Sequence, residues 1–268
     1  MLGIVFPEGY TFYYSSVKQN AQAMHSNHYH NEIEVYYMIS GKCNYFIDDK
    51  TYEVLPGDIV IIPENIIHKT NYDEEEHSRI VIECSRHFIP KTFLADLSEN
   101  AYVFRNPSIS REVSAMFKKI DAEYKNPDSY SADIIKSYMH LLIYLIARNK
   151  APVQSSESKN MVIEDVVTYI KRNFANDISL SSVAKLHFVS PEHLSRTFKR
   201  DTGFGFNEYL TLVRLQHAER MLKGPDDMSI SEIAYNCGFN DSNYFSDKFK
   251  RTYGQSPLKY RKENRQVL

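Results

Sequence analysis

Two histidines and a glutamate near the amino terminus are spaced so that they could bind a metal ion together. The segment 28–41 reads HYHNEIEVYYMISG, which separates His28, His30 and Glu34 by even numbers of residues. Side chains two or four residues apart on a β-strand point to the same side of the sheet, so all three can face one interior. Imidazole and carboxylate groups are common ligands of divalent metal ions. The pattern therefore indicates a metal site, or a descendant of one that now senses a small molecule.

The segment from about residue 10 to residue 85 is expected to supply the strands that position these side chains. It contains short runs rich in Tyr, Ile and Val that are broken by turn residues. Residues 42–47 and 51–55 predict a hairpin, and residues 59–62 predict a buried strand that ends at Pro63. This part of the chain therefore predicts an all-β sandwich or barrel.

The pattern changes to helix between residues 108 and 150, with a break at Pro127. The second predicted helix, residues 130–149, has two apolar rows, one made of Ile134, Tyr138, Leu141 and Leu145 and the other of Ile135, Met139, Leu142 and Ile146. One row can cover the β-domain, and the other then needs a second partner. We expect this partner to be a second copy of the chain, the alternative being burial within the monomer.

Composition favours an ordinary globular protein. The 268 residues suffice for two domains, and the start MLGIVFPEGY lacks the basic region of a signal peptide, so we expect a cytoplasmic protein that does not contact membranes. Three widely spaced cysteines indicate packed thiols rather than disulfides. The polar stretch 151–160 predicts a linker. Lys and Arg number 15 against 20 Asp and Glu in residues 1–156, but 17 against 14 in residues 157–268, which permits nucleic-acid binding by the second part.

The second part contains an internal repeat. Leu180, Val183 and Ala184 have equivalent residues fifty positions later. Leu194, Phe198, Gly203 and Tyr209 have equivalent residues fifty-one positions later. In each copy a short helix precedes a turn, and Ser190 or Asp241 is placed to cap a second helix. This order predicts two helix-turn-helix units, whose second helices enter the DNA major groove. A helical hairpin repeat that binds no DNA would explain the apolar positions but not the cations on the second helices.

The sequences IAYNCGF, NYFSDKFKR and GQSPLKYR, at residues 233–239, 243–251 and 254–261, are the most specific part of a longer resemblance. Over about 100 residues the chain resembles the DNA-binding domain of AraC/XylS-type transcriptional regulators. The resemblance implies two helix-turn-helix units joined by one long helix at about residues 206–223. At 1.5 Å per residue this helix is about 27 Å long, which suits recognition helices that enter successive major grooves about 34 Å apart.

The resemblance also assigns residues to DNA contact. The candidates that face the groove or the phosphates are Glu192, His193, Ser195, Arg196, Lys199, Ser242, Asn243, Ser246, Asp247, Lys250 and Arg251. Arg196 can form a bidentate contact with guanine, and Asn243 with adenine. The lysines and Arg251 are better suited to phosphate contacts. Asp247 stands where the family's pattern commonly has a basic residue, so we expect the first unit to dominate sequence reading.

The first part resembles the cupin sensor domain of the same family, in which a Gly-x-x-x-x-x-Pro segment is followed by a histidine, here His68. The resemblance to metal cupins implies a divalent metal held by His28, His30, Glu34 and His68. The resemblance to sensor cupins implies instead a metal-free effector pocket, to which we assign His28, His30, Glu34, Tyr36 and His68. A vestigial cluster is the third alternative. Neighbouring tyrosines suggest a sugar as effector, although tyrosines on strands often belong to the core; they are Tyr13, Tyr14, Tyr29, Tyr36, Tyr37 and Tyr45.

Together these features predict an α+β chain of two domains, with a cupin-like β-barrel and helical dimerisation element followed by an all-α tandem helix-turn-helix domain. We expect an effector-sensing domain at 1–107, a dimerisation element at 108–150, a linker at 151–160 and the DNA-binding domain at 161–268. The predicted partners are double-stranded DNA, a small-molecule effector, a second copy of the chain and RNA polymerase. We expect no enzymatic activity and no cofactor; the alternative is a metal-dependent cupin enzyme or metal sensor.

Overall fold

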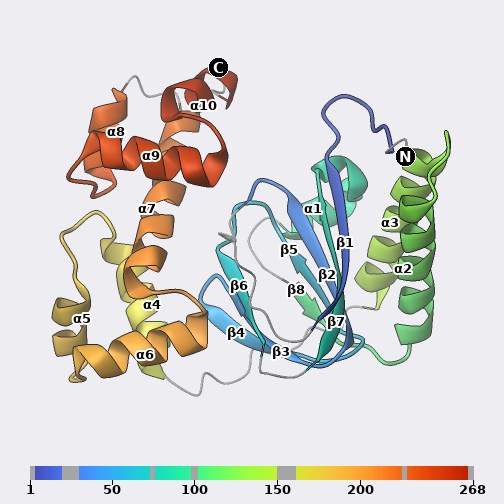
Figure 1. The fold of residues 1–268 in the computed structure, drawn as a ribbon, viewed down its shortest axis with the longest axis horizontal. Helices are drawn as coiled ribbons and strands as arrows, with labels where there is room; N and C mark the ends of the chain where they lie inside the picture. Colours follow the sequence, from blue (N-terminus) through green and yellow to red (C-terminus); the bar gives the residue numbers. More distant parts are fainter. Residues whose placement is uncertain are drawn as a thin grey trace. The chain divides into compact units, whose positions relative to one another are not determined.

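Strands and a few helices form the first part of the chain and helices form the second, as expected for an α+β protein of two domains (Figure 1). The structure, a computed structural model, describes residues 4–19, 30–72, 76–97, 102–149, 161–224 and 228–264. The chain divides into two compact units, the first made mainly of residues before 157 and the second mainly of residues after it. His28 and the expected linker 151–160 lie outside the described residues.

The first unit contains two sheets. The five-stranded sheet has the order β1 (Phe12–Gln19), β7 (His77–Cys84), β2 (Ile33–Ser40), β5 (Ile59–Ile62) and β8 (Tyr102–Phe104). The three-stranded sheet has the order β4 (Lys50–Val54), β3 (Cys43–Ile47) and β6 (His68–Asn71). The predicted hairpin is β3–β4, and the predicted strand at 59–62 is β5. Within the described residues no pairing joins the two sheets, so they form a cupin-like sandwich rather than a closed barrel.

Alternation along the strands gives the five-stranded sheet two apolar faces. Tyr36 of β2 lies opposite Val81 of β7, and the next residue, Tyr37, lies opposite Ile80. Tyr36 and Val81 belong to a core that includes buried residues of β3 and β4, whereas Tyr37 and Ile80 belong to a core shared with helices. The sheet is therefore the middle of three layers, because side chains alternate between its faces.

Helices cover the outer face of the five-stranded sheet (Figure 1). These helices are the short η1 (Arg86–Phe88), α1 (Lys91–Leu97), α2 (Ser110–Lys125) and α3 (Ser131–Arg148). The break between α2 and α3 falls at the predicted proline. One apolar row of α3, which contains Met139 and Leu142, is fully buried against this face. Leu141, in the other row, is 52% exposed.

The second unit is all helical. Its helices are α4 (Met161–Asn173), α5 (Leu180–Leu186), α6 (Pro191–Thr202), α7 (Phe206–Lys223), α8 (Ile230–Asn236), α9 (Ser242–Tyr253) and α10 (Pro257–Asn264). The predicted joining helix has the bounds of α7. Alanines 184 and 234 are fully buried in α5 and α8, where small side chains allow neighbouring helices to approach closely. No helix among the described residues is long and apolar enough to cross a membrane.

Candidate functional site

The second helix of each helix-turn-helix unit begins at the predicted cap. The Ser190 hydroxyl accepts a hydrogen bond from the backbone N–H of His193 at 3.2 Å. The Asp241 carboxylate accepts from the N–H groups of Asn243 and Tyr244 at 2.6 and 2.9 Å. These caps satisfy amide groups that have no partner within the helix, and they set where α6 and α9 begin. The first turn of each helix, which reaches base edges in such units, is thereby well defined.

The residues assigned to DNA contact lie on the outer surfaces of α6 and α9. All eleven are exposed except Ser242 and Ser246, which are partly exposed. Other side chains of the same helices, such as Phe198 and Phe249, are buried, each with 0% of its surface exposed. Each helix is thus amphipathic, with one face in the core of its unit and the opposite face in solvent.

The basic residues on these surfaces carry charge that no carboxylate offsets. Within the described part of the chain, Arg196, Lys199, Lys250 and Arg251 form no ion pair. Arg200 differs, because its guanidinium contacts Asp201 at 2.7 Å. Such uncompensated cations on one surface are the usual electrostatic feature of a DNA-binding face. Asp247 is exposed on α9 and weakens this feature in the second unit.

An exposed phenylalanine marks the turn of the first unit, which we did not expect from the sequence. Phe188 is 95% exposed and has a φ of 56°, a conformation that bulky residues rarely adopt. Gly238, with a φ of 83°, occupies the corresponding position of the second unit. The sequence repeat could have indicated this backbone strain, because it aligns Phe188 with Gly238 and glycine is the residue that adopts a positive φ most readily. Phe188 lies two residues before Ser190, the cap of α6.

The structure brings three of the four predicted metal ligands together. Ligand atoms of His30, Glu34 and His68 lie within 4.8 Å of one another. Glu34 and His68 are 0% and 1% exposed, and the rings of His30 and His68 meet edge to face with centroids 5.1 Å apart. Two imidazoles and one carboxylate at this distance suit a divalent ion. The structure also places the Tyr45 hydroxyl as a hydrogen-bond donor to Glu34.

Tyrosine hydroxyls extend this polar cluster between the two sheets. The Tyr36 hydroxyl lies 3.1 Å from that of Tyr72, and Tyr36 and Tyr45 are both fully buried. Burial raises the pKa of Tyr36 and Tyr45 above the usual value, and raises that of Tyr72 to about 12. All three phenols therefore remain protonated near neutral pH and can donate hydrogen bonds.

Other tyrosines that we associated with an effector lie elsewhere. The Tyr14 hydroxyl donates to Asp121 of α2 at 2.7 Å, and the Tyr37 ring stacks on Phe117 of α2 at 4.5 Å. Both side chains face the helical layer because they alternate with the residues that point between the sheets. They support the fold and do not contribute to the polar cluster. Tyr29 lies outside the described residues.

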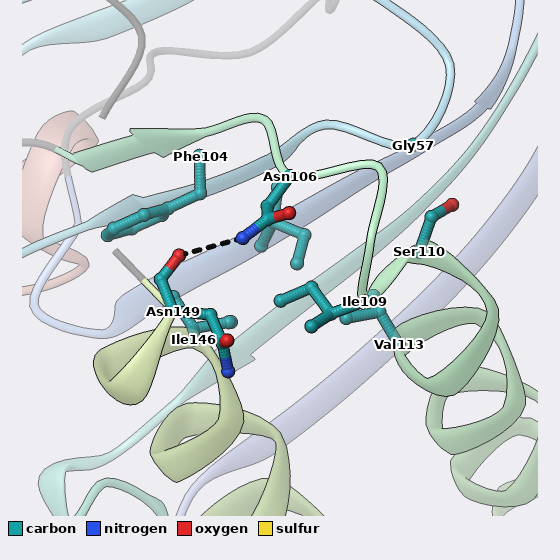
Figure 2. Close-up of a pocket in the computed structure, with 9 residues that line it drawn as sticks. Gly57, Phe104, Asn106, Ile109, Ser110, Val113, Ile146 and Asn149 are labelled. Carbon is teal, nitrogen blue, oxygen red and sulfur yellow. Dashed lines mark hydrogen bonds between the residues drawn. The ribbon is translucent and has the colours of Figure 1, made fainter. Parts of the chain in front are cut away.

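A small polar joint connects the sheet to the end of α3 (Figure 2). The Asn106 side-chain amide donates to the carbonyl oxygen of Asn149 at 3.1 Å. Gly57, Asn106, Ile146 and Asn149 line a cavity of about 10 Å³, room for a single water molecule. Next to it in sequence, Arg105 forms a double ion pair with the buried Asp58, with distances of 2.8 and 2.7 Å. The sequence did not lead us to these asparagines, since their partners are distant along the chain.

Comparison with known proteins matches both units. Residues 10–141 match the model of the AraC-like ligand binding domain, and residues 183–263 match that of a helix-turn-helix domain. The two matches occur in one chain, in this order. The chain belongs to the AraC family of transcriptional regulators. The resemblance inferred from the sequence is confirmed.

Named relatives of this AraC-family chain are regulators of transcription. An uncharacterized HTH-type transcriptional regulator of Escherichia coli, YijO, is 38% identical over 41% of the chain and 39% of its own length. The transcriptional activator RhaS of an Enterobacter species is 31% identical over 58% of the chain and 55% of its own length. The matched part therefore spans less than two thirds of either relative. Neither is named as an enzyme, in agreement with our expectation for this chain.

Among solved structures, the C-terminal domain of AraT, a response regulator from Geobacillus stearothermophilus, is 33% identical. The match covers 41% of this chain and 92% of that domain, with a TM-score of 0.40.

Proposed function

We propose that this AraC-family protein is a sequence-specific DNA-binding regulator of transcription that a small molecule controls through the first unit. The observation that carries the proposal is the pair of capped helices α6 and α9, whose exposed faces carry cations that form no ion pair within the described residues, with Lys199 and Lys250 at corresponding positions. The repeated apolar residues would also be explained by helical hairpins that bind no DNA. Exposed cations such as Arg196 and Lys250 are instead suited to binding a polyanion such as DNA. Arg196, Lys199, Lys250 and Arg251 are proposed to contact DNA.

One monomer is proposed to bind two successive major grooves. Helix α7 joins the two units and has 18 residues, which corresponds to about 27 Å. Successive grooves on one face of B-form DNA are about 34 Å apart. The recognition helices α6 and α9 lie toward opposite ends of α7 (Figure 1). We expect α6 to read bases through Arg196 and its neighbours, and α9 to contribute mainly phosphate contacts through Lys250 and Arg251.

The effector is proposed to bind within the polar cluster between the two sheets of the first unit, where His28, His30, Glu34, Tyr36 and His68 were expected to act. Phenol hydroxyls and ring faces of this kind suit a sugar, which is our first expectation for the effector class. Binding would favour one arrangement of the DNA-binding units over another, a coupling free energy between two sites. The Asn106–Asn149 hydrogen bond supports this idea, since it ties the sheet to the C-cap residue of α3.

We further propose that the protein acts in the cytoplasm as a homodimer, with the exposed row of α3 as the subunit contact and RNA polymerase as a partner at promoters. Leu141 of this row is 52% exposed, and covering it would remove apolar area from water.

Selection of binding sites from random double-stranded DNA tests the main proposal. The full chain should enrich a sequence whose conserved positions form two clusters about one helical turn apart. Footprinting of the enriched DNA should protect both clusters on one face. An Arg196→Ala, Lys250→Ala double variant should lose this enrichment but keep its fold. Enrichment of no sequence, with binding equal for all DNA, would contradict sequence-specific regulation.

A metal sensor is the second candidate, and the approach of His30, Glu34 and His68 within 4.8 Å favours it. A bound metal ion would replace the small molecule as the signal, and it would control the same DNA-binding units. These three side chains would hold the ion; His28 would be the fourth ligand of the predicted set.

A further inference from the structure

A cleft on the first unit lies apart from the polar cluster between the sheets. It has a volume of about 610 Å³ and is open to solvent. Tyr10, the segment of residues 86–94 and one face of α3 form its walls. Ligand pockets range from roughly 300 to 1,000 Å³, so the cleft has room for a small organic molecule. None of its lining residues belongs to the proposed effector site.

Positive side chains line this cleft, and no carboxylate among the described residues does. Arg86, Lys91 and Lys136 are among its lining residues, together with His87 and His140. Arg86 is neutralised by a carboxylate outside the cleft, that of Glu64, which accepts from its Nε atom at 2.7 Å. Among the described residues, Lys91 and Lys136 have no such partner. The cleft thus carries net positive charge.

Lys136 is held in place by an aromatic stack. Its ammonium group donates to the Tyr10 hydroxyl at 3.0 Å and lies 5.0 Å from the centroid of the same ring. The His87 ring stacks on Tyr10 with centroids 4.1 Å apart, and Phe88 meets Tyr10 edge to face at 5.7 Å. A neutral phenol uses one of three ammonium protons and offsets no charge. Lys136 is therefore pre-positioned and can still donate to an anion, which lowers the entropic cost of binding.

The rest of the cleft offers apolar and aromatic surface. Ile89 and Leu94 line it from one side, and His140 and Tyr144 follow Lys136 at intervals of four residues on α3. Residues four apart lie on one face of a helix, so the charged and aromatic groups form a continuous wall. An occupant that matches this wall has an anionic group near Lys136 and an apolar body beyond it.

We propose that this cleft binds a small organic carboxylate carried on an aromatic or other apolar body. The site is separate from the proposed effector site and does not depend on it. Because three of the lining residues belong to α3, whose neighbouring face we assign to the dimer, bound carboxylate would stiffen this helix. The cleft could instead be covered by another copy of the chain, and the experiment below distinguishes this occupant from a carboxylate.

Isothermal titration of the full chain with naphthalene-1-acetate tests the proposal, with neutral naphthalene-1-acetamide as the matched probe. The carboxylate should bind at least about tenfold more tightly than the amide, as expected for one charge-assisted hydrogen bond. Lys136→Met keeps the apolar stem and should remove this difference, whereas Lys136→Arg should retain most of it. Lys125→Met is the control, since Lys125 lies on α2 and pairs with Asp121 at 2.7 Å. It should bind like the unaltered protein.

Three outcomes would overturn the proposal. The first is equal binding of carboxylate and amide, or no binding of either. The second is carboxylate binding that survives Lys136→Met but is lost in His68→Ala, which would place the anion between the sheets. The third is weaker self-association of Lys136→Met in sedimentation velocity without any change in carboxylate binding, which would assign the cleft to a second copy. Circular dichroism and thermal unfolding of each variant verify that it is folded.

Discussion

Arg214 of α7 donates a hydrogen bond from its Nε atom to the carbonyl oxygen of Phe174 at 2.8 Å. A second donor of the same guanidinium reaches the carbonyl oxygen of Asn176 at 2.9 Å. Gly238, in the turn of the second helix-turn-helix unit, packs against the Phe174 carbonyl as well. The loop after α4, the joining helix and the second turn are therefore fixed to one another.

Gly238→Ala is expected to destabilise this junction. A Cβ atom there would lie 2.7 Å from the Phe174 carbonyl oxygen, and the φ of +83° is unfavourable for alanine. Gly254→Ala is the matched control, because its φ is +75° but a Cβ atom would meet nothing within 4 Å. Urea unfolding should show a loss of about 1 kcal/mol for Gly254→Ala and clearly more for Gly238→Ala. Equal losses of unfolding free energy in the two variants would mean that the close approach of Phe174 to Gly238 does not contribute to stability.

Arg196 and Asp247 occupy corresponding surfaces of the two units but should contribute unequally to DNA recognition. Arg196→Ala should cost about 1–3 kcal/mol in binding free energy and relax specificity at one position, as expected for a lost guanine contact. Asp247→Ala should leave specificity nearly unchanged and tighten binding slightly at low salt, because it removes repulsion from phosphate. Gel-shift titrations against single-base variants of the selected site measure both. The assignment is reversed if Asp247→Ala abolishes discrimination while Arg196→Ala does not.

Substitutions at Leu141 and Leu142 separate dimer contact from folding. Leu141 is 52% exposed, so Leu141→Glu should keep the fold but shift the protein toward monomer in light scattering. Leu142 is 0% exposed and packs in the core below α3, so Leu142→Glu should lower the free energy of unfolding by about 3 kcal/mol or more. A folded Leu141→Glu variant that remains fully dimeric would place the subunit contact elsewhere.

Elemental analysis of the purified protein decides between metal and effector. If His30, Glu34 and His68 hold a metal with His28, about one equivalent per chain should be present, and His68→Ala should abolish it. We expect instead metal-free protein whose melting temperature rises with an organic effector, in a screen that begins with sugars. His140→Ala, distant from the cluster in sequence, is the control for histidine loss. One tightly bound metal per chain, with no organic ligand effective, would favour the metal sensor.

His217 should make the second unit less stable in mild acid. Its ring stacks on Phe174 at 3.8 Å, and burial, followed by the charge of Arg220, lowers its pKa below the usual 6.5. Below about pH 6.5 the unfolded chain therefore binds more protons than the folded chain, so stability falls as pH decreases toward the lowered pKa. His217→Phe keeps the stack and should reduce this loss in thermal unfolding. The exposed His193→Phe should not, and a similar pH profile for all three proteins would contradict the assignment.

The sequence alone determined the order and the ends of most elements. Helix α7 has the bounds that the family resemblance implied. Ser190 and Asp241 cap the helices as expected, and the hairpin and the break at Pro127 fall within one or two residues of their predicted positions. These features depend on periodicity, caps and turn residues, whose interactions reach only a few positions along the chain. The repeat and its family motifs were equally visible, because they too are properties of the residue order.

Only the tertiary structure decided which residues meet across long distances in sequence. The sequence placed Tyr14 and Tyr37 on strands, but it did not show which face of the sheet each side chain occupies. In the structure both side chains contact helix α2. The rows of α3 were evident, but which row is buried depended on the sheet beneath it. His30 and His68 approach each other, and Lys136 reaches Tyr10, through the packing of separate elements. Burial and partnership are set by the opposing surface, and one segment's sequence does not contain that surface.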